Sequence, residues 1–245
     1  MSENEGKLDT VQSYDSEILS AGAMQKTVKS EGYGEFPIQI WKFKIKNETK
    51  YKQLLENCGW KLVEESETNS AGKITKLNYR LYYNDTTGKV LKDKIREGFN
   101  KGNYDKLVDS IPLLPIIQLL NDVDFQILQI EDYIERLHSA ISKKPRKYAY
   151  HIYEYIHSSL GKAVVLDHDV YRPYHVSQYF SEALNRLYQN DNTIPLNPNE
   201  WGDKHSQYET KLLDIYGPLR GEIFPNIINP MTDAIKRYNN LKSKL

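Results

Sequence analysis

The stretch IIQLLNDVDFQILQIEDYIERLHSAI, Ile116 to Ile141, decides the fold class of this 245-residue chain. Its apolar residues recur at intervals of three and four, which is the spacing of one face of an α-helix. These residues are Ile116, Leu119, Leu120, Val123, Ile127, Ile130, Ile134, Leu137 and Ile141. Because the stripe continues for about seven turns, we expect one long helix buried at the centre of the protein.

The chain on either side of this stretch predicts a mostly α (α+β) fold. The segments WKLVEE (60–65) and ITKLNYRLYY (74–83) alternate apolar and polar residues and flank the turn-rich NSAG. This pattern predicts a small antiparallel β-hairpin around 60–83. After residue 90 the pattern is helical, and the last helices are expected near 173–189, 204–216 and 230–243.

The first 59 residues contain fewer periodic signals. Residues 1–36 are predicted to form a short helix or coil followed by turns. The segment Ile38–Ile45 alternates like a strand, but the preceding Pro37 suits the first turn of a helix, so we expect a helix. Asn47 is expected to cap a further helix that runs through Cys58 and ends at Gly59.

Composition excludes several classes of function. Lysine plus arginine and aspartate plus glutamate both number 33, and a balanced charge argues against a nucleic-acid binder. No apolar run approaches the ~18 residues of a membrane span, and the N-terminus has neither the basic nor the apolar region of a signal peptide. The single cysteine, Cys58, allows no intramolecular disulfide and no cysteine-based metal site. We therefore expect a protein with no membrane or nucleic-acid partner.

The segment EGKLDTVQSYDSEILSAGAMQKT, Glu5 to Thr27, contains the best candidates for catalytic residues. Glu5 and Asp15 are followed by a small, turn-prone segment that leads to Gln25 and Thr27. Cleavage of a glycosidic bond needs one acid to protonate the leaving oxygen and a second carboxylate as base or nucleophile. Acidic pairs are also common on solvated surfaces, so the spacing fits a solvated acidic face as well.

Three segments, in order, resemble the lysozyme-like superfamily of peptidoglycan hydrolases, in a bacterial and phage branch with the pattern E…YD…ILSxGxxQxT. The first is the segment 5–27, and the second is ENCGW (56–60). The third, GKAVVLDHDVYRPYHV (161–176), is similar to a family segment of the type LDxxVNRP, with Tyr171 in place of the asparagine. The matches extend over most of the chain, from residue 5 to about residue 176.

The resemblance implies a single lysozyme-like domain over 1–245 with two lobes, 1–90 and 91–245. It implies hydrolysis of the β-1,4 glycan of bacterial peptidoglycan, with Glu5 as general acid and Asp15 as base or charge stabiliser. The other implied residues are Tyr14, Gln25, Thr27 and Trp201 for substrate binding, and Asp167, His168 and Arg172 in support of the cleft. No cofactor and no metal is implied, although Asp167, His168, Asp169 and His175 are of metal-ligand types.

The implied partner is peptidoglycan, with a secretion apparatus, a phage particle or an immunity protein as possible further partners. Without a signal peptide, such a protein would be made in the cytoplasm and reach the cell wall by non-classical export, injection or lysis.

Two alternatives stay open at this level. Only four residues precede Glu5, where the family carries a helix, and this favours a catalytically impaired wall-binding or assembly protein. Arg146 and His151 have the R-x4-H spacing found in some helical RNases, which is the third hypothesis.

Overall fold

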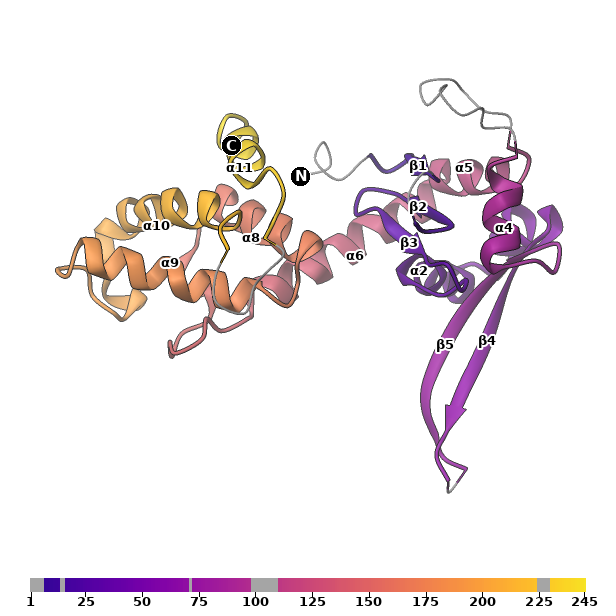
Figure 1. Ribbon diagram of the computed structural model, residues 1–245, viewed down its shortest axis with the longest axis horizontal. Helices are drawn as coiled ribbons and strands as arrows, with labels where there is room; N and C mark the ends of the chain where they lie inside the picture. Colours follow the sequence, from indigo (N-terminus) through magenta and orange to yellow (C-terminus); the bar gives the residue numbers. More distant parts are fainter. Residues whose placement is uncertain (1–6, 14–15, 71, 98–109, 224–229) are drawn as a thin grey trace. The chain divides into compact units, whose positions relative to one another are not determined.

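The computed structural model describes residues 7–13, 16–70, 72–97, 110–223 and 230–245 (Figure 1). It divides into two compact units, an N-terminal one up to Asp132 and a C-terminal one from Tyr133 to Leu245. Helices make up most of the described structure, so the predicted mostly α (α+β) class is confirmed. The division lies inside a helix and not at residue 90, and the single lysozyme-like domain stays a prediction.

The N-terminal unit begins with an antiparallel sheet in the order β1 (Val11–Gln12), β2 (Leu19–Ala21) and β3 (Lys26–Val28). The expectation of only coil, turns or a short helix is therefore wrong for the described part of 1–36. Strands of two and three residues are too short to show an alternating pattern. Burial in the core of the unit stabilises them, because Leu19, Ala21 and Val28 are all in contact with it.

The helix expected over Ile38–Ile45 is confirmed as α2 (Glu35–Lys46). The helix expected from Asn47 through Cys58 is shorter than predicted, because α3 (Glu48–Leu54) ends at Leu54 and a separate 3-10 turn, η1 (Glu56–Cys58), follows. The face of α2 that carries Phe36, Ile40 and Phe43 is buried, and this spacing is helical. The Asn47 side chain caps α3 by accepting a hydrogen bond from the backbone N–H of Lys50 at 3.1 Å. Gly59 ends η1 in the left-handed region at φ 93°.

The predicted hairpin is confirmed as β4 (Trp60–Thr68) and β5 (Ile74–Tyr83), and Figure 1 shows it extending away from α2. Its register pairs Trp60 with Tyr83 and Leu62 with Leu81. These four side chains are buried at the base of the hairpin, whereas the residues near its tip are exposed. The unit also contains the helices α4 (Gly88–Ile95) and α5 (Leu113–Asn121) and the first part of the helix that follows α5, up to Asp132.

The expectation of one central buried helix over 116–141 is wrong in two respects. Asp122 takes an extended conformation between α5 and α6 (Val123–Ile141), and its carboxylate accepts from the backbone N–H of Asp124 at 3.0 Å. The predicted stripe of α6 is also about half exposed, at Ile127, Ile130 and Ile134. The spacing of apolar residues identifies a helix, but it does not say which face the rest of the protein covers.

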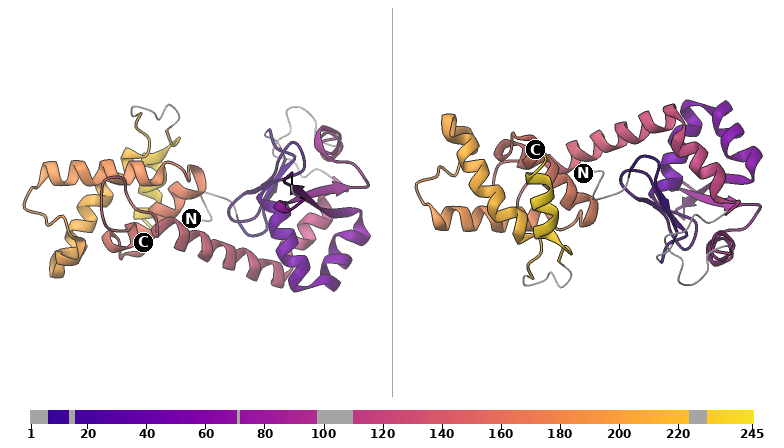
Figure 2. Two further views of the ribbon diagram at one scale, coloured as in Figure 1. Left: turned by 90° about the horizontal axis from the view of Figure 1, so that it is seen from below. Right: turned by 90° about the horizontal axis from the view of Figure 1, so that it is seen from above.

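The described C-terminal unit is helical. After α6 its elements are α7 (Ile152–Tyr155), α8 (Ser159–Tyr171), α9 (Val176–Asn190), η2 (Pro198–Glu200), η3 (Gly202–Lys204), α10 (His205–Leu219) and α11 (Ala234–Lys242). Figure 2 shows these helices in orange to yellow, and α10 packs against α9 and α11. The three helices expected near its end are confirmed as α9, α10 and α11. None of the helices in the described residues is both long and apolar enough to cross a membrane.

Candidate functional site

The predicted active-site segment is described in part. Glu5, Tyr14 and Asp15 lie outside the described residues. Thr27 lies in β3 opposite Ser20 of β2, and Gln25 directly precedes β3 with a left-handed φ of 47°.

The amide side chains of this segment meet across the sheet. The Gln12 amide at the end of β1 donates a hydrogen bond of 2.9 Å to the Gln25 amide oxygen. A non-glycine residue with positive φ is uncommon and needs support from its surroundings, which this bond supplies at Gln25. The sheet therefore holds a cluster of polar side chains in a defined arrangement.

The residues on either side of 14–15 are tied together. The Ser13 hydroxyl donates to the Ile18 carbonyl at 2.6 Å, and the Ile18 N–H donates to the Val28 carbonyl at 2.8 Å. Ile18 is thus bonded to β3, and Ser13 is bonded to Ile18.

Gln129 of α6 fixes the same segment from the other side. Its side chain is buried, accepts from the Ala23 N–H at 3.3 Å and donates to the Leu8 carbonyl at 3.0 Å. Gly22 has a left-handed φ of 75°, which favours glycine, and a Cβ there would lie 2.1 Å from the Gln129 amide oxygen and displace it. Sequence reasoning did not identify Gln129, and the signal that it offered was an amide within an otherwise apolar helical stretch.

Asp132, one turn further along α6, is the centre of a buried ionic cluster. Its carboxylate accepts hydrogen bonds from the ammonium groups of Lys26 and Lys42 and from the Gln39 amide, the last two at 2.7 Å. Burial raises the pKa of the Asp132 carboxyl, but these hydrogen bonds outweigh it and hold the pKa below its usual value. The cluster ties β3 and α2 to α6, and sequence reasoning missed it.

The α8 segment has a structural role in the C-terminal unit. The Asp167 carboxylate is fully buried and accepts from the Arg220 guanidinium at 2.8 Å and from Arg237 at 2.5 Å. The buried Nε atom of Arg172 has no hydrogen-bond partner among the described residues. Asp169 pairs with Arg136, at 3.3 Å.

His168 is fully buried in the same helix. Its Nδ1 lies 2.7 Å from the Tyr216 hydroxyl, which places the pair in the core of this unit. Burial, with smaller effects from nearby cations such as Arg220 and Lys143, lowers the pKa of His168 well below its usual value. In the described part of the chain, no group of three or more His, Cys, Asp or Glu side chains could hold a metal ion.

The buried neutral His168 makes stability depend on pH. An unfolded histidine takes up a proton near pH 6.5, whereas the folded one resists it, so stability is complete above about pH 6.5 and falls below it. We expect the free energy of unfolding to fall by up to about 1.4 kcal/mol per pH unit from this group. Melting temperatures of the wild type and His168→Gln between pH 7 and pH 5 measure the effect.

The His168→Gln variant should show the weaker pH dependence, and the control variant His138→Gln, at an exposed position of α6, should behave like the wild type. Equal slopes for all three proteins would contradict the expectation.

Two further predicted residues, Trp201 and His151, are held by contacts with neighbouring residues. Trp201 is 2 % exposed, its indole N–H donates to the Pro195 carbonyl at 2.8 Å, and its ring contacts Tyr155 and Tyr208. Trp201 therefore lies in the core of the C-terminal unit, and its ring is not available for the substrate binding that the resemblance implies. The His151 ring stacks on Tyr153, and its Nδ1 lies 2.7 Å from the Ser142 carbonyl.

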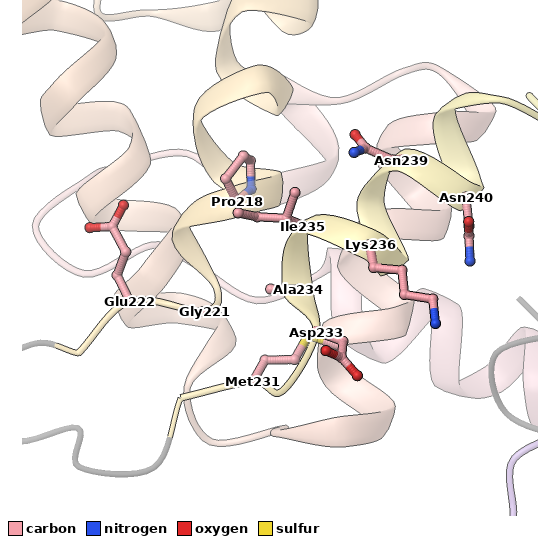
Figure 3. A pocket seen from close by; sticks show the side chains of 10 residues that line it. All are labelled: Pro218, Gly221, Glu222, Met231, Asp233, Ala234, Ile235, Lys236, Asn239 and Asn240. Atoms are coloured by element: carbon pink, nitrogen blue, oxygen red, sulfur yellow. The ribbon is translucent and has the colours of Figure 1, made fainter.

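A pocket of 690 Å³ lies where α10 ends and α11 begins (Figure 3). Its ten lining residues are labelled in Figure 3, and none of them belongs to the predicted site. The described predicted residues are also divided between the units, with Gln25 and Thr27 in the N-terminal one and the remainder in the C-terminal one.

In comparisons with known proteins, no family model, no curated protein and no solved structure matches this chain.

Proposed function

We propose that this protein is a glycoside hydrolase that cleaves the β-1,4 glycan backbone of bacterial peptidoglycan. Glu5 acts as the general acid, and Asp15 acts as the base or stabilises positive charge in the transition state. The ordered resemblance of three segments to lysozyme-like enzymes supports the assignment. Peptidoglycan is the partner in this proposal, reached by export, injection or lysis.

One structural observation carries the proposal: the segment with the predicted substrate-binding residues folds as a compact antiparallel sheet. Gln12 and Gln25 share a hydrogen bond of 2.9 Å, and the register pairs Ser20 with Thr27. Amides and hydroxyls are the groups that a sugar-binding surface uses, because they donate and accept hydrogen bonds. In the proposal, Gln25 and Thr27 hold the attacking water or an N-acetyl group of the substrate.

The attachment of this sheet to α6 supports the same function. Catalytic groups need a rigid second layer of contacts that holds their geometry. Gln129 binds the carbonyl of Leu8, three residues after Glu5, and Asp132 binds Lys26, the residue between Gln25 and Thr27. Both contacts restrain described residues of the segment 5–27, namely Leu8 and Lys26.

The test is hydrolysis of purified peptidoglycan, followed by the fall in turbidity and by release of reducing ends. We expect Glu5→Gln and Asp15→Asn each to lower the rate by about 10²–10⁴-fold, the usual size of an acid–base contribution. Glu56→Gln is the matched control, because Glu56 is an exposed acid in η1. Wild-type activity that Glu5→Gln leaves unchanged would end the assignment.

Sedimentation with the same purified peptidoglycan distinguishes the enzyme from the non-enzymatic alternative. A wall-binding or assembly protein would sediment with peptidoglycan without releasing reducing ends, and Glu5→Gln would sediment equally. An enzyme releases them, and the Glu5→Gln protein keeps binding while it loses the reaction.

A further inference from the structure

The N-terminal unit has a groove of 460 Å³ between the end of α2, the start of α3 and strand β4. Its lining residues are Trp41, Lys44, Ile45, Glu48, Leu62 and Glu64. The volume lies within the range of about 300–1,000 Å³ that is typical of ligand sites. None of these residues belongs to the proposed catalytic set.

Trp41 is the distinguishing residue of the groove. Of the three tryptophans, Trp60 and Trp201 are buried in the cores of their units, whereas Trp41 is only partly buried. The Trp41 ring stacks against Tyr79 with centroids 4.7 Å apart, and its remaining surface lines the groove. The stack fixes the orientation of the indole, so little side-chain entropy is lost when a ligand packs on it.

Apolar and polar groups are arranged in the groove for an amphipathic ligand. Trp41 and Ile45, one helical turn apart on α2, provide an apolar surface together with Leu62 of β4. Beside them stands the exposed Glu64 carboxylate, for which no hydrogen bond or ion pair with a described residue is found. An unpaired carboxylate next to an aromatic ring can accept hydrogen bonds from ligand hydroxyls.

The hairpin extends this surface in one direction. The register pairs Glu64 with Tyr79 and Ser66 with Leu77, and alternation places all four on the same face as Leu62. Leu77 is 45 % exposed, so a further apolar side chain lies on this face beyond the groove. A linear polymer could follow this face.

We propose that the Trp41 groove binds a β-linked N-acetylhexosamine oligosaccharide. A sugar ring has an apolar face of C–H groups that packs on an indole, and a rim of hydroxyls that carboxylates and ammonium groups bind. The charged groups are one lysine and two glutamates, which disfavours a phosphate or nucleic-acid ligand. The choice of sugar rests on the proposed function, but binding itself needs neither Glu5 nor Asp15.

The experiment is calorimetric titration of the full chain with tri-N-acetylchitotriose, using the wild type, Trp41→Ala, Glu64→Gln and Tyr153→Ala. We expect saturable binding that weakens about tenfold in Trp41→Ala, the effect of one lost aromatic contact. Glu64→Gln should also bind more weakly, whereas Tyr153→Ala, an exposed aromatic of the C-terminal unit, should bind like the wild type. Intrinsic fluorescence of the wild type should change on binding, because Trp41 is the accessible tryptophan.

Two results would overturn the proposal: no saturable binding by the wild type at millimolar sugar, or equal affinity in the wild type and Glu64→Gln. Glu64 is exposed, so its variant remains informative even if Trp41→Ala unfolds. The Glu5→Gln protein separates the two proposals. If it binds the trisaccharide but the wild type releases no reducing ends from peptidoglycan, the groove stands and the hydrolase does not.

Discussion

Asp167→Asn is expected to lower the free energy of unfolding of the C-terminal unit by about 3–5 kcal/mol, the usual cost of breaking a buried ion pair. Asp167 and Arg220 are both fully buried, and Arg237 is 15 % exposed at its side chain. The asparagine removes the negative charge and leaves two guanidinium groups without their counter-ion. Arg220 cannot move to water, because it also donates to the carbonyls of Gly217 and Val164.

Urea denaturation followed by circular dichroism measures this effect. The control is Asp214→Asn, because Asp214 pairs with Lys242 at 2.6 Å but both side chains are about half exposed. A surface pair of this kind contributes about 0–1 kcal/mol. Equal losses in the two variants would show that burial of Asp167 does not determine its contribution.

Phe125→Ala is expected to cost about 3–5 kcal/mol in the N-terminal unit, whereas Ile127→Ala should cost less than about 1 kcal/mol. Phe125 is fully buried, and its ring packs edge-on against Phe36 at 6.1 Å and Phe43 at 5.3 Å between centroids. Ile127 is 49 % exposed and leaves no enclosed cavity when it is shortened. The same helix therefore contains one of the most and one of the least sensitive apolar positions.

The two variants serve as controls for each other, since both shorten an apolar side chain of α6 to alanine. Urea denaturation should give clearly different midpoints. A larger loss from Ile127→Ala would show that the exposed face of α6 is covered by another surface in solution.

The partners of buried polar and charged residues could not be predicted from the sequence. The amide and ionic contacts of Gln129 and Asp132 organise the proposed active-site segment, yet neither residue belongs to a recognisable motif. The Lys26–Asp132 contact spans 106 positions of the chain. Trp201, implied by the resemblance to bind substrate, is instead buried in the core of the C-terminal unit.

Local signals in the chain were sufficient for the hairpin, for the presence of α2 and for the start of α3 after Asn47, whereas α3 ends at Leu54, earlier than predicted. Alternation over ten residues, an asparagine at a helix start and a glycine at a helix end act through their immediate neighbours, so they can be read without a structure. The tertiary structure alone decided the buried face of α6 and the partners of its polar residues. It also decided that Asp167 pairs with Arg220 and Arg237, which lie 53 and 70 positions away. Such pairs form because burial excludes water from charges that the fold has brought together, and no local pattern encodes that proximity.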